Sequence, residues 1–322
     1  MTGNANPVRR FGKGWGCAVA GFAIAFGLAW SGAAHAGYAS MIVDGTTGEV
    51  LNEVNPDAIN HPASLTKLMT MYIAFKTMQE GRMNMNTQLH VSAWAAGKSP
   101  TKLNLRAGTT VSMHDCILGM ITKSANDAAT VVAENIGGSE AGFAQMMNAE
   151  ARRLGMTNTH YDNASGLPDP GQITTARDLV KLSMAVYRDF PQYFPLFATR
   201  EFVFQGHMVH GHNNLMYHYP GMDGLKTGFI NASGFNLAST AVRGGHRLFG
   251  VVMGSTSAGI RDRLMATLLD NGFAHKPTDP ILVAEAGGVR PGAARRMLAS
   301  LSPIGSAEAA TPVAPRKARI AA

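Results

Sequence analysis

The segment from Ser64 to Met78 carries apolar side chains around almost the whole circumference of a helix. A helix that is apolar on all sides has to be buried inside a domain, because none of its faces suits water. The segment therefore predicts a central helix that other elements cover. Hydrophobic residues make up 46% of the 322 residues and charged residues 15%, which provides enough apolar material for a sizeable core.

Segments with the pattern of strands lie at both ends of the central region. Residues 38–52 alternate around turn residues and predict a β-hairpin, and residues 235–253 predict two strands joined by a Gly-Gly turn. Helical patterns lie between them over 112–155 and 178–187, and a last helix is predicted over 262–270. We expect one sheet built from distant parts of the chain, with a helical insertion.

The positive charge of the chain is concentrated at its two ends. Lys and Arg outnumber Asp and Glu by 28 to 21, yet residues 37–275 hold 18 basic and 18 acidic side chains. This neutral region argues against nucleic acid as a partner, because phosphate binding needs a basic face. Residues 276–322 are rich in Pro and Ala and predict a flexible basic tail. The tail either makes weak contact with the cell wall or a membrane surface, or is simply solvated.

The N-terminus has the three parts of an export signal. Basic residues within 9–13 precede an apolar run over 15–30, and small residues follow up to the Ala-His-Ala sequence at 34–36. We predict a signal peptide over 1–36 that is cleaved after Ala36, which places the mature protein in the periplasm or cell envelope. A retained membrane anchor is the alternative, although the run is slightly short against the roughly 20 residues of a spanning helix.

Neither the cysteines nor the histidines form a metal-binding pattern. Cys17 lies in the predicted signal and Cys116 in an apolar helical context, so we expect neither a disulfide nor a cysteine-based zinc site, and we interpret Cys116 as a core residue. The clustered histidines match no metal motif, and no acidic or Cys partner lies near them. These histidines are His207, His210, His212 and His218. We expect no metal and no other cofactor.

A Ser-x-x-Lys sequence opens the predicted central helix, with Ser64 and Lys67 three residues apart. This spacing places both side chains on one face of a helix, where an amine can reach a hydroxyl. Ser99 and Lys102 form a second match. Only Ser64 stands at the start of a buried helix, where free N–H groups stabilise a developing oxyanion and burial lowers a lysine pKa.

Two further triplets follow in the chain. Ser124-Ala125-Asn126 lies in the predicted helical insertion, where a hydroxyl can relay a proton and an amide can hold a peptide carbonyl. Lys226-Thr227-Gly228 precedes the late strands. In an edge strand its cation and hydroxyl can face a ligand carboxylate, and Gly228 lets a ligand backbone approach closely. Each triplet carries little information alone, but together and in this order they indicate one active site.

The set Ser-x-x-Lys, Ser-x-Asn and Lys-Thr-Gly resembles the signature of penicillin-binding proteins and class A β-lactamases. The wider sequences over 62–70, 123–129, 174–179 and 223–228 resemble the low-molecular-mass D-alanyl-D-alanine carboxypeptidases. This resemblance implies an α/β fold of the β-lactamase and penicillin-binding-protein type, with a mainly antiparallel sheet covered by helices and an all-helical subdomain. It also implies a single serine D,D-peptidase domain over 37–275 that trims the terminal D-alanine from peptidoglycan stem pentapeptides, takes part in cell-wall biogenesis and is inhibited by β-lactams.

The resemblance implies a role for each motif residue. Ser64 is the nucleophile, Lys67 the neutral general base and Ser124 the proton relay. The backbone N–H groups of Ser64 and Phe229 form the oxyanion hole. The remaining residues bind substrate: they are Asn126, Lys226, Thr227, Gly228 and Arg261, the last expected just before the final helix.

Some features depart from the family pattern. Phe229 replaces a polar residue and His212 replaces an arginine of some relatives. Residues 161–169 contain no Glu, whereas a β-lactamase uses an acid in this region to activate the deacylating water. An endopeptidase that cuts peptidoglycan cross-links would use the same machinery and remains an alternative. A non-catalytic peptidoglycan-binding protein would have lost a motif residue, and none is lost.

Overall fold

The computed structural model describes residues 37–289, 292–293 and 296. The predicted signal peptide and most of the predicted tail lie outside these residues. Among the residues described, no helix is both long and apolar enough to cross a membrane.

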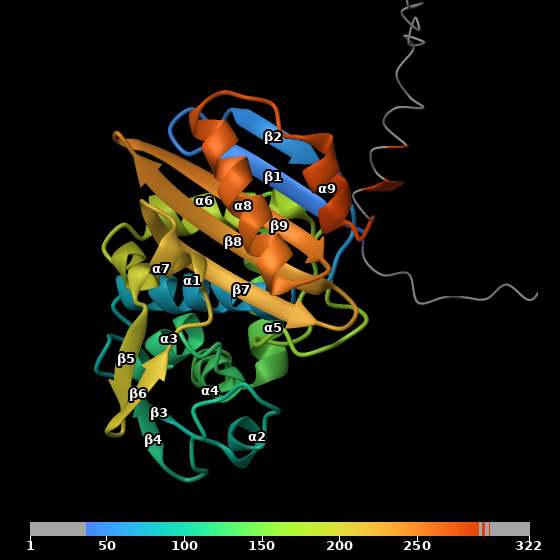
Figure 1. Cartoon of the computed structure of the whole chain (residues 1–322). Helices are drawn as coiled ribbons and strands as arrows, with labels where there is room; N and C mark the ends of the chain where they lie inside the picture. Colours follow the sequence, from blue (N-terminus) through green and yellow to red (C-terminus); the bar gives the residue numbers. More distant parts are fainter. Residues whose placement is uncertain (1–36, 290–291, 294–295, 297–322) are drawn as a thin grey trace, which may run out of the picture. The chain divides into compact units, whose positions relative to one another are not determined.

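Five antiparallel strands form the central sheet in the order β2-β1-β9-β8-β7 (Figure 1). The strands are β1 Ala39–Asp44, β2 Val50–Val54, β7 Met222–Ile230, β8 Gly234–Arg243 and β9 His246–Ser255. The predicted hairpin and both late strands are therefore confirmed. Strand β1 pairs with β9 although about 200 residues separate them, so the sheet joins the two ends of the domain. Strand β7 lies at the edge, as expected for the Lys-Thr-Gly sequence.

The two faces of the sheet are covered by different helices. Helices α8 (Ala258–Phe273) and α9 (Pro280–Ala286) lie on one face, and α1 (Thr66–Gln79) and α6 (Ala176–Asp189) on the other (Figure 1). Along β1 successive side chains enter opposite cores: Met41 packs on the α1 side and Ile42 on the α8 side. Helix α1 is buried around most of its circumference, which confirms the central helix.

A second, mainly helical part lies beyond α1 and carries one small pair of strands. Its elements are β3 Gln88–His90, α2 Ala93–Ala96, β4 Thr110–Ser112, α3 Met113–Ile121, α4 Asn126–Gly137 and α5 Glu140–Arg153. Strand β3 pairs with β4. The expectation of an all-helical subdomain is therefore wrong in this detail. The elements that remain are η1 Ala63–Leu65, η2 Phe194–Ala198, β5 Glu201–Phe204, β6 His207–His210 and α7 Leu215–His218.

Two helix boundaries differ from the sequence analysis. The Ser257 hydroxyl caps α8 by accepting a hydrogen bond from the Ile260 N–H, so this helix begins earlier than predicted and Arg261 lies within its first turns. Helix α9 lies in the segment where a flexible tail was expected, with Pro at its start and Asp279 as its cap. Ala286 of this helix is fully buried in the α8-side core. The Thr175 hydroxyl caps α6 by accepting a hydrogen bond from the Asp178 N–H.

Candidate active site

Ser64 and Lys67 lie together at the start of α1. The chain makes one 3₁₀ turn over Ala63–Leu65 and continues as α1, so Lys67 lies one turn beyond the serine. Lys67 Nζ donates a hydrogen bond to Ser64 Oγ at 3.0 Å. The serine is partly exposed, whereas Lys67 is fully buried. The predicted pair is therefore brought within hydrogen-bonding distance.

The ammonium group of Lys67 is held from two further sides. It donates to Asn126 Oδ1 at 2.7 Å and to the backbone carbonyl of Ser165. Burial and, after it, the nearby cation Lys226 hold the Lys67 pKa well below its usual value, against a smaller opposing effect of Asp127. A lysine in this setting loses its proton more readily than an exposed one, and the neutral amine can accept the proton of the serine hydroxyl.

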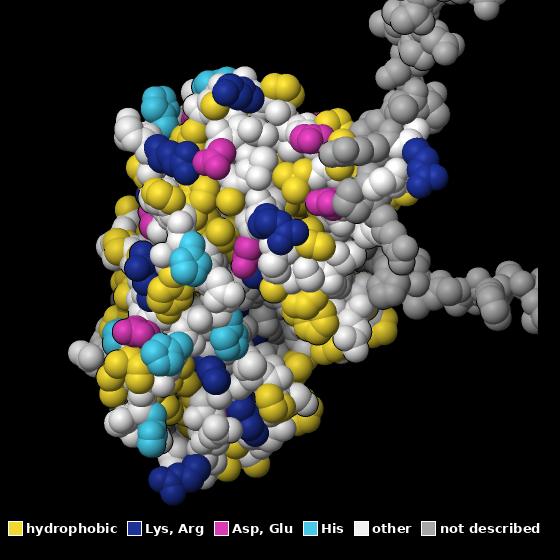
Figure 2. All heavy atoms as spheres, in the orientation of Figure 1, with side chains coloured by type: hydrophobic (Ala, Val, Ile, Leu, Met, Phe, Trp, Pro, Cys, Tyr) yellow, Lys and Arg dark blue, Asp and Glu magenta, His cyan; other side chains and the backbone are white. Residues whose placement is uncertain are grey.

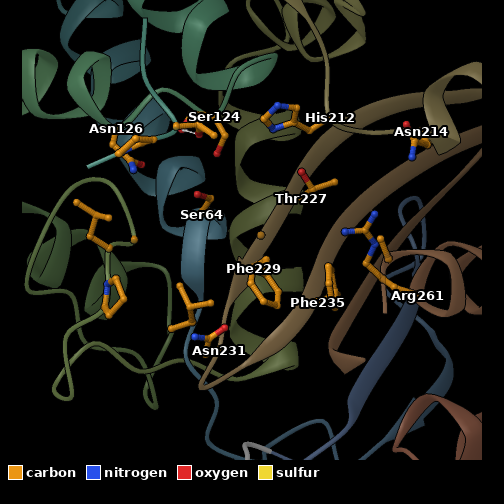
Figure 3. A pocket seen from close by; sticks show the side chains of 18 residues that line it. Ser64, Ser124, Asn126, His212, Asn214, Thr227, Phe229, Asn231, Phe235 and Arg261 are labelled. Carbon is orange, nitrogen blue, oxygen red and sulfur yellow. Dashed lines mark hydrogen bonds between the residues drawn. The ribbon is translucent and has the colours of Figure 1, made fainter. Parts of the chain in front are cut away.

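Ser124 and Asn126 face this pair from the helical subdomain (Figure 3). Ser124 adopts a left-handed backbone with φ 58°, which is uncommon outside glycine and turns the chain sharply into α4. The Asn126 amide donates to the Ser99 carbonyl at 2.9 Å while its oxygen accepts from Lys67. These two bonds fix the orientation of the amide between Lys67 and the 99–105 segment.

Asp127 holds the 99–105 segment in place. Its buried carboxylate accepts hydrogen bonds from the Leu103 N–H at 2.9 Å and the Leu105 N–H at 3.0 Å. The segment is thereby tied to the start of α4, next to Asn126. The second Ser-x-x-Lys sequence lies here, but Ser99 is exposed and Lys102 Nζ donates to the Ala96 carbonyl. Ser99 and Lys102 therefore do not form a second serine–lysine pair.

Strand β7 forms the opposite wall of the site. A Cβ added at Gly228 would lie 3.1 Å from the Ser64 nitrogen and 3.2 Å from the Pro62 carbonyl oxygen, so a side chain here would press on the backbone that carries Ser64. Thr227 lies at the cavity beside Gly228. Lys226 is buried beneath them and donates to the Thr227 carbonyl at 2.8 Å. Burial, and then the charge of Arg261, lower the Lys226 pKa to about 7.

A loop over residues 163–167 closes the site behind the nucleophile. A Cβ at Gly166 would lie 1.8 Å from the Ala63 carbonyl oxygen, and both Gly166 and Ala63 have a positive φ. The Asn163 side chain shapes the loop by accepting hydrogen bonds from the Ser165 and Gly166 N–H groups. This packing carries the Ser165 carbonyl to Lys67. This loop was not predicted from the sequence, although its Asn-x-x-Gly spacing is a signal that indicates a turn.

These walls enclose a cavity of about 560 Å³. Figure 3 shows Ser64 between Ser124 and Asn126 on one side and Thr227 and Phe229 on the other, and in Figure 2 the surface is hollowed below the sheet. Arg261 and His212 also line the cavity, whereas Lys226 does not. No acidic side chain is found among the described residues that line it.

The two basic residues at the cavity have different environments. Arg261 is buried and its guanidinium donates to Asp262 Oδ1 at 2.7 and 2.9 Å, which fixes its plane. Burial, and then the charges of Lys226 and Lys123, lower the His212 pKa, so its imidazole is neutral at neutral pH. Within residues 37–289, no three His, Cys, Asp or Glu side chains are arranged to hold a metal ion.

Glu140 ties together the two loops that supply carbonyl groups to the site. Its side chain accepts hydrogen bonds from Trp94 Nε1 at 2.8 Å and the Ala164 N–H at 3.4 Å and forms an ion pair with Lys98. Lys98 precedes Ser99, and Ala164 precedes Ser165. One carboxylate therefore anchors both segments from which Asn126 and Lys67 receive their backbone partners.

Replacing Glu140 with Gln should destabilise the fold by about 3 kcal/mol, because Lys98 would keep a charge that is about nine-tenths buried without its counterion. Urea denaturation measures the change in the free energy of unfolding. Glu201→Gln is the matched control, since Glu201 pairs with His210 while 48% exposed, and we expect a change below about 0.5 kcal/mol. An equal loss in the two variants would contradict the anchoring role of Glu140.

Comparison with known proteins agrees with this geometry. The profile of a peptidase family, S11, described as D-alanyl-D-alanine carboxypeptidase, matches residues 29–257. The chain belongs to the D-alanyl-D-alanine carboxypeptidase family. The resemblance inferred from the motifs is thereby confirmed, and so is the fold class.

Individual members of the carboxypeptidase family show the extent of the similarity. The D-alanyl-D-alanine carboxypeptidase DacC of Escherichia coli is 35% identical over 240 residues, which cover 72% of this chain and 60% of DacC. The crystal structure of penicillin binding protein 6B from Escherichia coli is 34% identical, with a TM-score of 0.70, over 74% of this chain and 77% of that one. The chain therefore spans about 60% of the length of DacC, and the similarity covers the domain that carries the site.

A second similar structure contains a β-lactam. It is penicillin-binding protein D2 from Listeria monocytogenes in its ampicillin-bound form, which is 30% identical, with a TM-score of 0.65. The match covers 74% of this chain and 98% of that one.

Proposed function

We propose that this protein is a serine D-alanyl-D-alanine carboxypeptidase that removes the terminal D-alanine from peptidoglycan stem pentapeptides. The observation that carries the proposal is the hydrogen bond from a buried Lys67 with a lowered pKa to a partly exposed Ser64 at the cavity. Membership of the carboxypeptidase family supports the same reaction.

In the proposed acylation step, Ser64 Oγ attacks the carbonyl carbon of the penultimate D-alanine. The hydroxyl proton passes to neutral Lys67, and the N–H groups of Ser64 and Phe229 stabilise the oxyanion. The C–N bond then breaks, and a proton reaches the leaving amine of D-alanine through the Ser124 hydroxyl. An ester of Ser64 remains. Water hydrolyses this ester, which releases the shortened peptide as an acid and restores the serine.

The substrate is held along the free edge of β7. Because β7 is the edge strand next to Ser64, an extended peptide can add to the sheet there through backbone hydrogen bonds. The Thr227 hydroxyl and the Arg261 guanidinium line the cavity and bind the terminal carboxylate. Lys226 contributes its charge from beneath the surface, and the Asn126 amide orients the peptide. Gly228 leaves room for the ligand backbone.

Two related activities are less well supported. Penicillin hydrolysis needs an acid that activates the deacylating water, and the described lining residues include no Asp or Glu. We therefore propose that β-lactams acylate Ser64 and are released slowly, as inhibitors; ampicillin is bound in the relative from Listeria monocytogenes. Cleavage of peptidoglycan cross-links would use the same residues, so only product analysis separates an endopeptidase from a carboxypeptidase.

The proposed substrate lies outside the cytoplasmic membrane, and this agrees with the proposal that residues 1–36 are an export signal cleaved after Ala36. The mature catalytic domain would then begin at residue 37, with the basic segment at its C-terminal end in weak contact with the cell wall or a membrane surface. N-terminal sequencing of the protein recovered from the cell envelope tests the cleavage position.

Release of free D-alanine from a synthetic stem pentapeptide tests the proposed activity. We expect one equivalent of D-alanine per pentapeptide and none from the tetrapeptide, because only the pentapeptide has the terminal D-Ala-D-Ala bond. A cross-linked muropeptide is assayed in parallel. Cleavage of the cross-link without D-alanine release from the pentapeptide would overturn the assignment in favour of an endopeptidase, and no reaction with either substrate would overturn both.

The charge of Lys226 predicts how substrate binding changes with pH. Its pKa of about 7 means that the ammonium loses its proton as the pH rises through neutrality, so attraction of the substrate carboxylate weakens. We expect KM for the pentapeptide to rise about tenfold between pH 6 and pH 9. Lys226→Arg stays charged over this range and should give a flatter KM profile. Identical profiles for the two proteins would contradict the role of the Lys226 charge.

A further inference from the structure

A second cavity of about 450 Å³ adjoins the active-site cavity. The two cavities share Phe229, Asn231 and Phe235 from the β7–β8 hairpin. From there the second cavity extends past the end of β9, at Thr256, to Tyr38 before β1 and Gly287 after α9. It therefore crosses one end of the sheet from the β7 edge towards β1. No step of the proposed reaction takes place in the second cavity.

The lining of the second cavity suits a neutral polyol. None of the described residues that line it is charged. The rings of Phe229 and Phe235 lie 4.4 Å apart, and Phe229 is 50% exposed, so an apolar ring face is available to a ligand (Figure 3). Asn231 and Thr256 supply exposed polar groups at the wall. A sugar ring combines apolar C–H faces with hydroxyl groups and matches this combination, whereas a charged group would be desolvated without a counterion.

The position of the second cavity agrees with the direction of the proposed substrate. A peptide that pairs antiparallel with β7 and has its carboxylate at Thr227 has its N-terminal side at Asn231, where the second cavity begins. Four extended residues span about 13–14 Å, which is also the length of chain from Thr227 to Asn231 along β7. The far end of a stem peptide can therefore reach the end of this cavity that lies at Asn231.

We propose that the second cavity binds an uncharged sugar residue of the glycan strand to which the stem peptide is attached. This inference rests on the proposed carboxypeptidase function and adds a subsite to it. The enzyme would then act preferentially on glycan-linked stem peptides, because the sugar adds contacts that a free peptide lacks.

The test compares kcat/KM for a free stem pentapeptide and for the same pentapeptide attached to the disaccharide. We expect kcat/KM to be roughly tenfold higher for the glycan-linked substrate, because one good aromatic stacking contact changes an affinity by about this factor. Thr256→Trp fills the cavity from one wall and should remove the preference while leaving the free peptide unchanged. Gly287→Leu fills it from the other wall, where the backbone φ of −79° accepts a side chain. Thr157→Trp is the control, at an exposed threonine away from both cavities.

The outcomes separate the subsite from the reaction itself. Equal kcat/KM for the two substrates, or a preference that survives both filling variants, would overturn the sugar subsite while D-alanine release upholds the carboxypeptidase. No D-alanine release from either substrate would overturn the proposed function as well. A loss of activity towards the free peptide in both filling variants would show that the cavity binds the peptide and would also overturn the inference.

Discussion

The Ser64→Ala variant should form no covalent adduct with benzylpenicillin and should lose turnover of the pentapeptide by roughly 10⁴-fold or more. Among the described residues, Ser64 is the one whose hydroxyl forms a hydrogen bond with the buried amine of Lys67, so it is the nucleophile that this amine can activate. Intact mass after incubation with the drug measures the adduct directly. The wild-type protein should gain the mass of one penicillin molecule and keep it through the measurement.

Ser99→Ala is the matched control for this experiment. Ser99 belongs to the second Ser-x-x-Lys sequence, but it is exposed, and the site uses only its backbone carbonyl, which alanine retains. The Ser99→Ala variant should therefore acquire the same adduct as the wild type. An adduct that survives Ser64→Ala would contradict the assignment of the nucleophile. Rapid drug hydrolysis by the wild type without a lasting adduct would support a β-lactamase instead.

The central helix and its serine–lysine pair could be predicted because they depend on local sequence. An all-round apolar helix has to be buried, and a spacing of three residues places Ser64 and Lys67 on the same face. The strands of the sheet could be predicted for a similar reason, since alternation and turn residues are also local. The bounds of strand β7 were not predicted; an edge strand was considered only for its Lys-Thr-Gly sequence, and the edge position of β7 agrees with that expectation.

The backbone partners of Lys67 and Asn126 could not be predicted because they come from distant loops. The Ser165 carbonyl lies 98 residues from Lys67, and the Ser99 carbonyl that orients Asn126 could come from any residue type. Only packing determines them: Gly166 fits against Ala63, and Asp127 accepts the N–H groups of the 99–105 segment. Helix α9 was missed because its seven residues fall in a Pro- and Ala-rich segment, and burial of Ala286 outweighs that composition.

The Lys67→Met variant should lose kcat for the pentapeptide by roughly 10²- to 10⁴-fold, the usual contribution of a positioned general base. Methionine fills the buried space left by the lysine stem but accepts no proton from Ser64. The pH dependence provides the sharper measurement. In the wild type, kcat should rise as the pH passes upward through the lowered pKa of Lys67, because the neutral amine is the active form. In the variant this rise should disappear, since the titrating group is gone.

Lys102→Met separates the role of the base from the effect of losing any lysine near the site. Lys102 Nζ donates to the Ala96 carbonyl and not to Ser99 or Ser64, so its replacement should leave kcat and the pH profile unchanged. Thermal unfolding of both variants shows whether the fold is retained, because Asn126 and Ser165 lose a donor in Lys67→Met. A folded Lys67→Met protein that keeps the pH-dependent rise would show that another group removes the serine proton. The buried lysine would then only position Ser64 and Asn126.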